Sequence, residues 1–252
     1  MQAMQVQIDG YPLTFNASDP DSDIIAIAQK KLHTQGSRWP FKWVTIQEVP
    51  ANATHSYNAT AAAKDSGATP FKRPENMAWL PGSDFRTFFF SATGDTQIAP
   101  GMVPELAARG VWGAIFRVDQ EQGRHDGYDG YISLFILGDA EHAGFDNMVF
   151  ADETHLLVAE DRNDTLHSQL KFYDSVWNYD IATRRSSRLI ALGVDRFCCG
   201  LKSSDNEPSG LTISNGSTEK RDMIGTVENM RNARFFITVQ HGKNRVLEIL
   251  PK

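Results

Sequence analysis

The sequence has little cysteine, no excess of basic residues and no long apolar run. Its two cysteines, Cys198 and Cys199, are adjacent, so they offer neither a disulfide framework nor the ligand spacing of a zinc site. With 25 Lys and Arg against 31 Asp and Glu, the chain lacks the clustered positive charge that a nucleic-acid backbone requires, which argues against nucleic acid as a partner. No apolar run is long enough to cross a bilayer, so we expect no membrane partner. The first residues show no basic segment followed by an apolar one, which leaves localisation open.

What is present is the composition of a globular protein. Of 252 residues, 41% are hydrophobic and 22% are charged, enough to bury a substantial core. We interpret residues 1–252 as a single domain. One helix is expected at Asp23–Leu32, after the cap-forming residues 19–22. The segment 47–70, rich in Ala, Asn, Ser and Thr, is expected to be a loop.

Strand-like segments occur in three similar units, each of which begins with an acidic residue. The opening strands are expected at 75–80, 146–150 and 207–214, and the second strands at 87–93, 155–159 and 235–239. Further strands are expected at 111–118, 131–137, 176–179, 188–192 and 245–250. Short β-branched and aromatic runs between turn residues predict an all-β fold, and four strands per repeated unit are typical of a β-propeller. A β-sandwich is the alternative.

Three units are too few for a closed ring, because propellers have about four to eight blades. We therefore expect a partial propeller. The ring would be completed by strands near the N-terminus, at 4–8 and 42–46, by a missing N-terminal segment, or by a second chain.

The acidic residues that open the units predict a metal site. The innermost strand of each propeller blade lines the channel, so Glu75, Asp146 and Glu207 would converge there. Carboxylates in a confined space repel one another unless a cation neutralises them, and oxygen ligands suit Ca²⁺. Further ligands, or residues that orient them, are expected from the ends of the second strands and from neighbouring amides: Asp95, Glu160, Asp161, His241, Asn76 and Asn147. The alternative is that these are turn residues facing water, and three copies in register disfavour it.

Four short motifs, in this order, resemble those of PhoX-type calcium-dependent alkaline phosphatases. They are Gly67-Ala68-Thr69-Pro70 with Arg73-Pro74-Glu75, then Phe145-Asp146-Asn147, Glu207-Pro208-Ser209-Gly210 and Gln240-His241-Gly242. The resemblance runs from about residue 8 to the C-terminus.

The resemblance implies a propeller that hydrolyses small-molecule phosphate monoesters with Ca²⁺ and Fe³⁺. Arg73 would grip the phosphate, because its planar fork can bond two phosphate oxygens at once. Glu75 would act in catalysis as a metal ligand, and no side-chain nucleophile is required. The further metal ligands would be Asp146, Asp161 and Glu207, and the further substrate contacts Asn147 and His241. The resemblance also implies a secreted or periplasmic protein.

One segment of that family has no counterpart here. Its members carry a cysteine that ligates iron near the N-terminus, and Cys198 and Cys199 stand in a different context. Fe³⁺ would therefore lack that sulfur ligand, whereas the expectation of Ca²⁺ does not depend on it. Two other hypotheses fit the same carboxylates: a calcium-dependent lactonase on a related propeller, and a non-catalytic calcium-binding propeller fragment.

Overall fold

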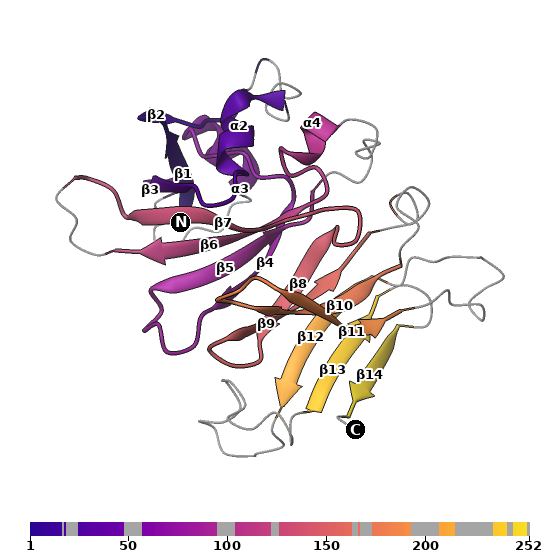
Figure 1. Ribbon diagram of the computed structural model, residues 1–252. Coiled ribbons are helices and arrows are strands. Elements are labelled where there is room, and N and C mark those ends of the chain that lie inside the picture. The colour runs from indigo at the N-terminus through magenta and orange to yellow at the C-terminus, as the bar shows by residue number, and fades with distance from the viewer. Residues whose placement is uncertain are drawn as a thin grey trace.

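Antiparallel strands dominate the computed structural model (Figure 1). It describes residues 1–16, 18, 25–47, 57–94, 104–121, 126–162, 166, 173–192, 207–214, 234–240 and 244–250. The first sheet has the order β2-β1-β3-β7-β6-β5-β4. Its strands are β1 (Gln2–Ile8), β2 (Tyr11–Pro12), β3 (Arg38–Thr45), β4 (Pro74–Trp79), β5 (Thr87–Ala92), β6 (Ala114–Gln120) and β7 (Gly130–Leu137).

Two smaller sheets follow along the chain. The second has the order β11-β10-β9-β8 and the third the order β12-β13-β14. Their strands are β8 (Phe145–Phe150), β9 (His155–Glu160), β10 (Ser175–Asp180), β11 (Ser186–Ala191), β12 (Pro208–Ser214), β13 (Arg234–Val239) and β14 (Arg245–Ile249). Strands therefore occupy all three predicted units.

Each unit is an antiparallel meander that starts in the middle of the molecule. The runs β4 to β7, β8 to β11 and β12 to β14 each pair strand by strand in chain order. The opening strands are neighbours, since β4 contacts β8 and β8 contacts β12. The described strands form open sheets, and they do not make a closed ring.

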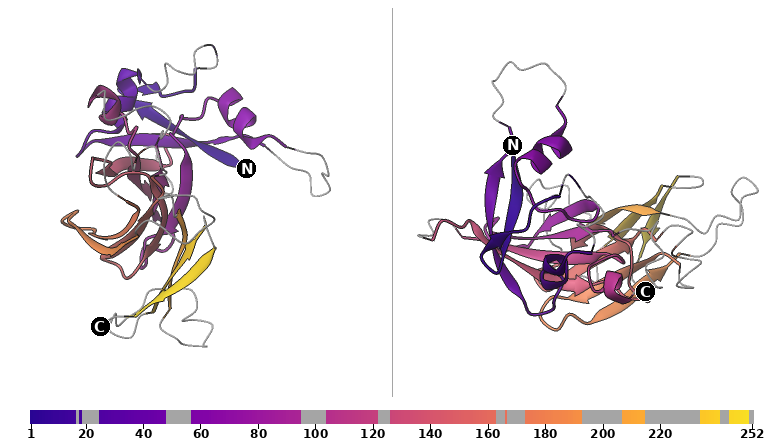
Figure 2. Two further views of the ribbon diagram at one scale, coloured as in Figure 1. Left: turned by 90° about the vertical axis from the view of Figure 1, so that its right-hand side faces the viewer. Right: turned by 90° about the horizontal axis from the view of Figure 1, so that it is seen from above.

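The N-terminal strands correct one expectation about closure. β3 pairs with the outer edge of β7, from Arg38 opposite Ser133 to Phe41 opposite Gly130, and β1 pairs with β3. They lengthen the first sheet because β7 offers a free edge and because Phe41 is fully buried in that sheet's core. β1 and β14 lie on opposite sides of the molecule in every view (Figures 1 and 2). These strands therefore do not complete a ring beside the third sheet.

The sheets are held together by apolar side chains on both of their faces. Successive residues of a strand point to opposite faces. Phe88 thus packs with Met4 and Phe116 on one face of the first sheet, and Phe89 packs with Trp177 of the second sheet on the other. On its far face the second sheet packs against the third through residues such as Leu157 and Ile237.

The helices are short. The predicted helix at Asp23–Leu32 is confirmed as α2 (Ile27–Leu32), with Ala26 as its N-cap, and residues 19–24 lie outside the described residues. The expected loop at 47–70 contains α3 (Ala59–Asp65), because Asn58 Oδ1 accepts a bond from Ala61 N, 3.0 Å away, and caps an alanine-rich run. The remaining helix is α4 (Pro104–Ala107). None of the helices in the described ranges has the length and apolarity of a membrane span.

Candidate metal centre

Each opening strand carries a β-bulge at its start. An extra residue separates the paired positions Pro74 and Met77 in β4, Phe145 and Met148 in β8, and Pro208 and Gly210 in β12. A bulge leaves a residue unpaired and re-aims the local side chains. In β4 and β8 the bulge contains the acidic residue of the motif, whereas Glu207 directly precedes β12. The three units thus share a β-bulge at, or directly after, the acidic residue that opens each sequence repeat.

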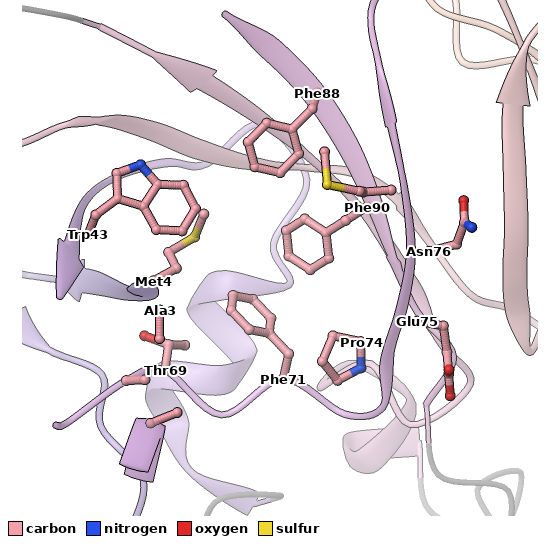
Figure 3. Close-up of a pocket in the computed structure, with 13 residues that line it drawn as sticks. Ala3, Met4, Trp43, Thr69, Phe71, Pro74, Glu75, Asn76, Phe88 and Phe90 are labelled. Carbon is pink, nitrogen blue, oxygen red and sulfur yellow. The ribbon is translucent and has the colours of Figure 1, made fainter. Parts of the chain in front are cut away.

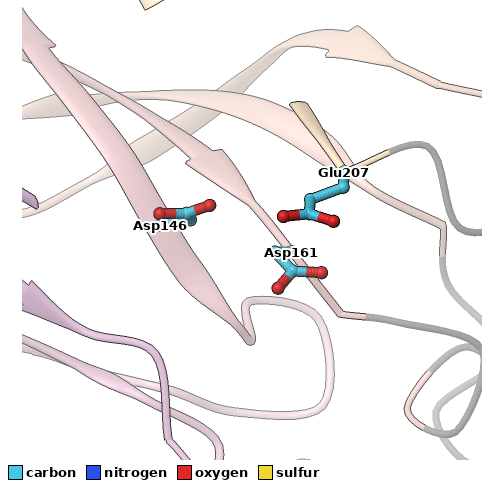
Figure 4. Close-up of side chains that lie close together, drawn as sticks. All are labelled: Asp146, Asp161 and Glu207. Atoms are coloured by element: carbon cyan, nitrogen blue, oxygen red, sulfur yellow. The ribbon is translucent and has the colours of Figure 1, made fainter. Parts of the chain in front are cut away.

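Three carboxylates meet beside these bulges (Figure 4). The ligand atoms of Asp146, Asp161 and Glu207 all lie within 4.8 Å of one another. Asp146 comes from β8, Asp161 follows the end of β9, and Glu207 precedes β12. Both aspartates are buried and Glu207 is half-buried. The structure therefore brings together three of the four residues expected to be metal ligands.

Glu75 lies beside this cluster and not within it. Its Oε1 is 3.4 Å from Arg73 Nε, and Arg73 Nη2 is 3.4 Å from Asp161 Oδ2. One guanidinium thus connects Glu75 to the carboxylate cluster. Glu75 still acts on the cluster through its charge, which contributes to a raised pKa of Asp146.

The backbone of Arg73 has an unusual conformation. Its φ is 52°, in the left-handed region that residues other than glycine rarely adopt. The segment is held by backbone bonds from Thr93 N to Arg73 O at 2.9 Å and from Gly94 N to Lys72 O at 3.1 Å. A strained residue that the surrounding structure holds in place is typical of a functional site.

The electrostatics of Asp146 indicate a site built for a cation. Burial, followed by the negative charges of Asp161, Glu75 and Glu207, raises the pKa of Asp146 from its ordinary value of 3.8 to about 7. Arg73 opposes this shift only in part. Several carboxylate oxygens at this spacing are the donor set that hard cations such as Ca²⁺ prefer. The residues present therefore fit a bound hard cation.

Two hydrogen bonds hold Asp146 in place. Ser91 Oγ donates to the backbone oxygen of Asp146 at 2.7 Å, and Asn147 Nδ2 donates to its Oδ1 at 3.2 Å. Ser91 was not expected from the sequence, because a serine inside an apolar strand carries no motif. Asn147 lies next to the cluster, as expected, and contacts a carboxylate of it.

Other candidates have different positions. Asn76 Oδ1 accepts a bond from Met148 N at 3.1 Å, so its oxygen joins β4 to β8. Glu160 is not among the three clustered carboxylates, and its side chain is completely buried against Arg162. Strand alternation could have revealed this, because neighbours such as Glu160 and Asp161 face opposite sides. Asp95, His241, Cys198 and Cys199 lie outside the described residues.

Comparison with known proteins points to one family. The family model described as alkaline phosphatase PhoX matches residues 19–242. No curated protein matches this chain. A solved structure, a puromycin-hydrolysing peptidase of Mycobacterium tuberculosis, aligns with a TM-score of 0.39 and 12% identity over 87% of this chain and 27% of that one. The chain thus spans about a quarter of the length of that peptidase.

Proposed function

Because this chain belongs to the alkaline phosphatase PhoX family, we propose that it hydrolyses small-molecule phosphate monoesters at the carboxylate cluster. The observation that carries the proposal is the guanidinium of Arg73, which lies 3.4 Å from Asp161, a member of a three-carboxylate cluster. A cation site and a group that binds anions are therefore adjacent. A phosphoryl group needs both, since its oxygens carry negative charge that grows or shifts during transfer.

Asp146, Asp161 and Glu207 would hold the ion, with Glu75 as a further ligand. When bound, such an ion would offset the negative charge on the phosphoryl oxygens. Ca²⁺ is the first candidate because the described donors are oxygens. Fe³⁺ is the second, from the family resemblance, and titration with each ion separately would distinguish them.

Arg73 would orient the phosphate through its planar fork. Glu75 holds Nε of the same guanidinium, so it positions Arg73 as well as adding negative charge near Asp146. Asn147 and His241 are proposed as further substrate contacts. Asn147 stands beside Asp146, 3.2 Å from its carboxylate.

Hydrolysis of p-nitrophenyl phosphate with added Ca²⁺ or Fe³⁺ tests the proposal. We expect activity that a chelator abolishes, and Arg73→Ala should lower kcat/KM about 100-fold or more, as the loss of one group that stabilises a transition state does. Arg38→Ala is a matched control, because Arg38 pairs with Glu121 on the exposed surface. Full activity in Arg73→Ala would refute the role of that residue.

Parallel assays with a lactone and with p-nitrophenyl phosphate distinguish the phosphatase from the two competing functions, a calcium-dependent lactonase and a non-catalytic fragment. A lactone is uncharged before it is attacked, so its binding depends less on a guanidinium beside the ion than the binding of a phosphate does, which favours the phosphatase. Lactone hydrolysis without phosphatase activity would favour the lactonase instead. Stabilisation by Ca²⁺ without hydrolysis of either substrate would indicate a non-catalytic calcium-binding propeller fragment.

We also propose that the three meanders are propeller blades. The contacts of β4 with β8 and of β8 with β12 support this, because opening strands lie side by side around a propeller channel. Further blades, from a second chain or from a longer form of this chain, would close the ring. Light scattering after size exclusion tests the first route, and a monomer with full activity would exclude it. The family resemblance supports a secreted or periplasmic location.

A further inference from the structure

An apolar cavity lies on the side of β4 that faces the N-terminal strands (Figure 3). Its volume is about 380 Å³. The walls come from β1, β3, β4, β5 and α3, and most of the lining side chains are apolar. Those that form its body include Met4, Trp43, Phe71, Phe88 and Phe90.

The cavity borders the proposed catalytic centre. Phe71, Pro74 and Glu75 line it, and Arg73 belongs to the same short segment of chain. Figure 3 shows the rings of Phe71 and Pro74 on the cavity side of β4, whereas the side chain of Glu75 lies at the end of β4 on the side away from these rings. The Arg73 guanidinium lies 3.4 Å from Glu75 on this rim and 3.4 Å from Asp161 in the cluster.

Apolar surface continues outside the cavity along β4. Met77 lines the cavity and is 47% exposed, and Trp79 and Phe85 are 36% and 73% exposed. The rings of Trp79 and Phe85 are in edge contact at 5.6 Å. Apolar surface that gathers around a cavity is typical of a binding site.

We propose that this cavity binds the apolar group of the substrate, so that the enzyme prefers phosphate monoesters with an alkyl or aryl leaving group. This inference rests on the proposed phosphatase function. A phosphate bound by Arg73 would have its ester substituent next to the rim at Glu75. The apolar walls would bury an alkyl or aryl group, whereas a polar leaving group would lose its hydration there.

A series of n-alkyl phosphates from ethyl to hexyl tests this preference. We expect kcat/KM to rise about fourfold for each methylene that is buried, with glycerol phosphate among the poorest substrates. Ala63 of α3 lines the cavity, so Ala63→Phe should fill it and flatten this rise. The matched control is Ala61→Phe on the same helix, because Ala61 is exposed and does not line the cavity. Ala63→Leu replaces Ala63→Phe if thermal unfolding shows that the larger ring disturbs the fold.

Binding without turnover separates this proposal from the catalytic one. Calorimetry with hexylphosphonate should show tighter binding than ethylphosphonate, and the difference should vanish in Ala63→Phe. Trp43 fluorescence should change with hexylphosphonate, and Trp43→Phe should remove that change. If no ester is hydrolysed but these differences are found, the cavity is a binding site and the catalytic proposal fails. If all esters are hydrolysed equally and the phosphonates bind alike, the catalytic proposal stands and the cavity proposal is overturned.

Discussion

Arg162 Nη2 lies 2.6 Å from Glu160 Oε1, and both side chains are completely buried. Glu160 Oε1 also accepts a bond from Ala143 N at 3.0 Å, and Asp174 Oδ1 accepts one from Arg162 N at 3.0 Å. In the sequence, Asp161 lies between Glu160 and Arg162. The buried ion pair therefore fixes the backbone on both sides of a carboxylate that belongs to the proposed metal site.

Removing one partner of this pair should destabilise the fold. Arg162→Met leaves the Glu160 carboxylate buried without its cation, which typically costs about 3–5 kcal/mol in the free energy of unfolding. The double variant Glu160→Leu/Arg162→Met should recover much of that loss, because it removes both charges. Urea unfolding measures both effects. Arg38→Met, which breaks an exposed pair with Glu121, should cost about 1 kcal/mol or less. Equal losses in Arg162→Met and Arg38→Met would contradict this account.

Asp161→Asn should weaken cation binding. A cation that binds only the folded protein stabilises it, by about 2.7 kcal/mol at a concentration 100 times Kd. Adding Ca²⁺ should therefore raise the Tm of the wild type, and the increase should shrink in Asp161→Asn. Differential scanning calorimetry provides the measurement. The matched control is Asp152→Asn, an aspartate paired with His155 away from the cluster, which should keep the full increase.

The pKa of Asp146 predicts how the stability of the cation-free protein varies with pH. Its pKa is about 7 in the fold and 3.8 ordinarily, so the folded state binds the additional proton between these values. Stability from this group is therefore present at low pH and is lost as pH rises through about 7. The Tm without cation should fall between about pH 4 and pH 7 and level off above that range, and Asp146→Asn should reduce that fall. A wild-type Tm that rises over this range, with no effect of Asp146→Asn, would disprove the assignment.

The same proton competes with the cation. Since Asp146 must ionise to bind a cation, Ca²⁺ affinity should decrease as pH falls below about 7. Calorimetry at pH 6 in buffers of different ionisation enthalpy should detect protons released on binding. Asp146→Asn should release fewer protons, and an unchanged release would place the titrating group elsewhere.

Gly144→Ala should disturb the cluster through the backbone. Gly144 has a φ of 71°, and a Cβ added there would lie 2.4 Å from the backbone oxygen of Asp161. Gly127, with a φ of 77° and nothing within 4 Å of an added Cβ, provides a control for the backbone strain alone. Gly144→Ala should lower the Tm and the Ca²⁺ affinity clearly more than Gly127→Ala. Similar effects of the two variants would exclude a steric role for Gly144.

Much of the fold could be predicted from local patterns. Short apolar and aromatic runs, such as those that contain Phe88 and Leu157, mark strands when turn residues bound them, because buried strands are rich in such side chains. Pairing of the N-terminal strands was not predictable in the same way. β3 pairs with β7 through residues 89 to 95 positions away in the chain, from Phe41 opposite Gly130 to Arg38 opposite Ser133, and no local pattern specifies such a partner. The helix α3 was missed because its alanines and Asn58 were interpreted as loop residues.

The sequence by itself determined the family, the strands of the three repeats and the acidic residues worth examining, because motifs and strand periodicity are properties of neighbouring residues. Only the tertiary structure decided which carboxylates meet. Asp146, Asp161 and Glu207 come from three separate places in the chain: the first two meet because β8 pairs with β9, and Glu207 joins them because β12 packs against these strands. Glu75 is instead held by Arg73 at the edge of that cluster, and Glu160 faces the interior. Convergence depends on bulges and on packing between distant strands, and neither is encoded within one motif.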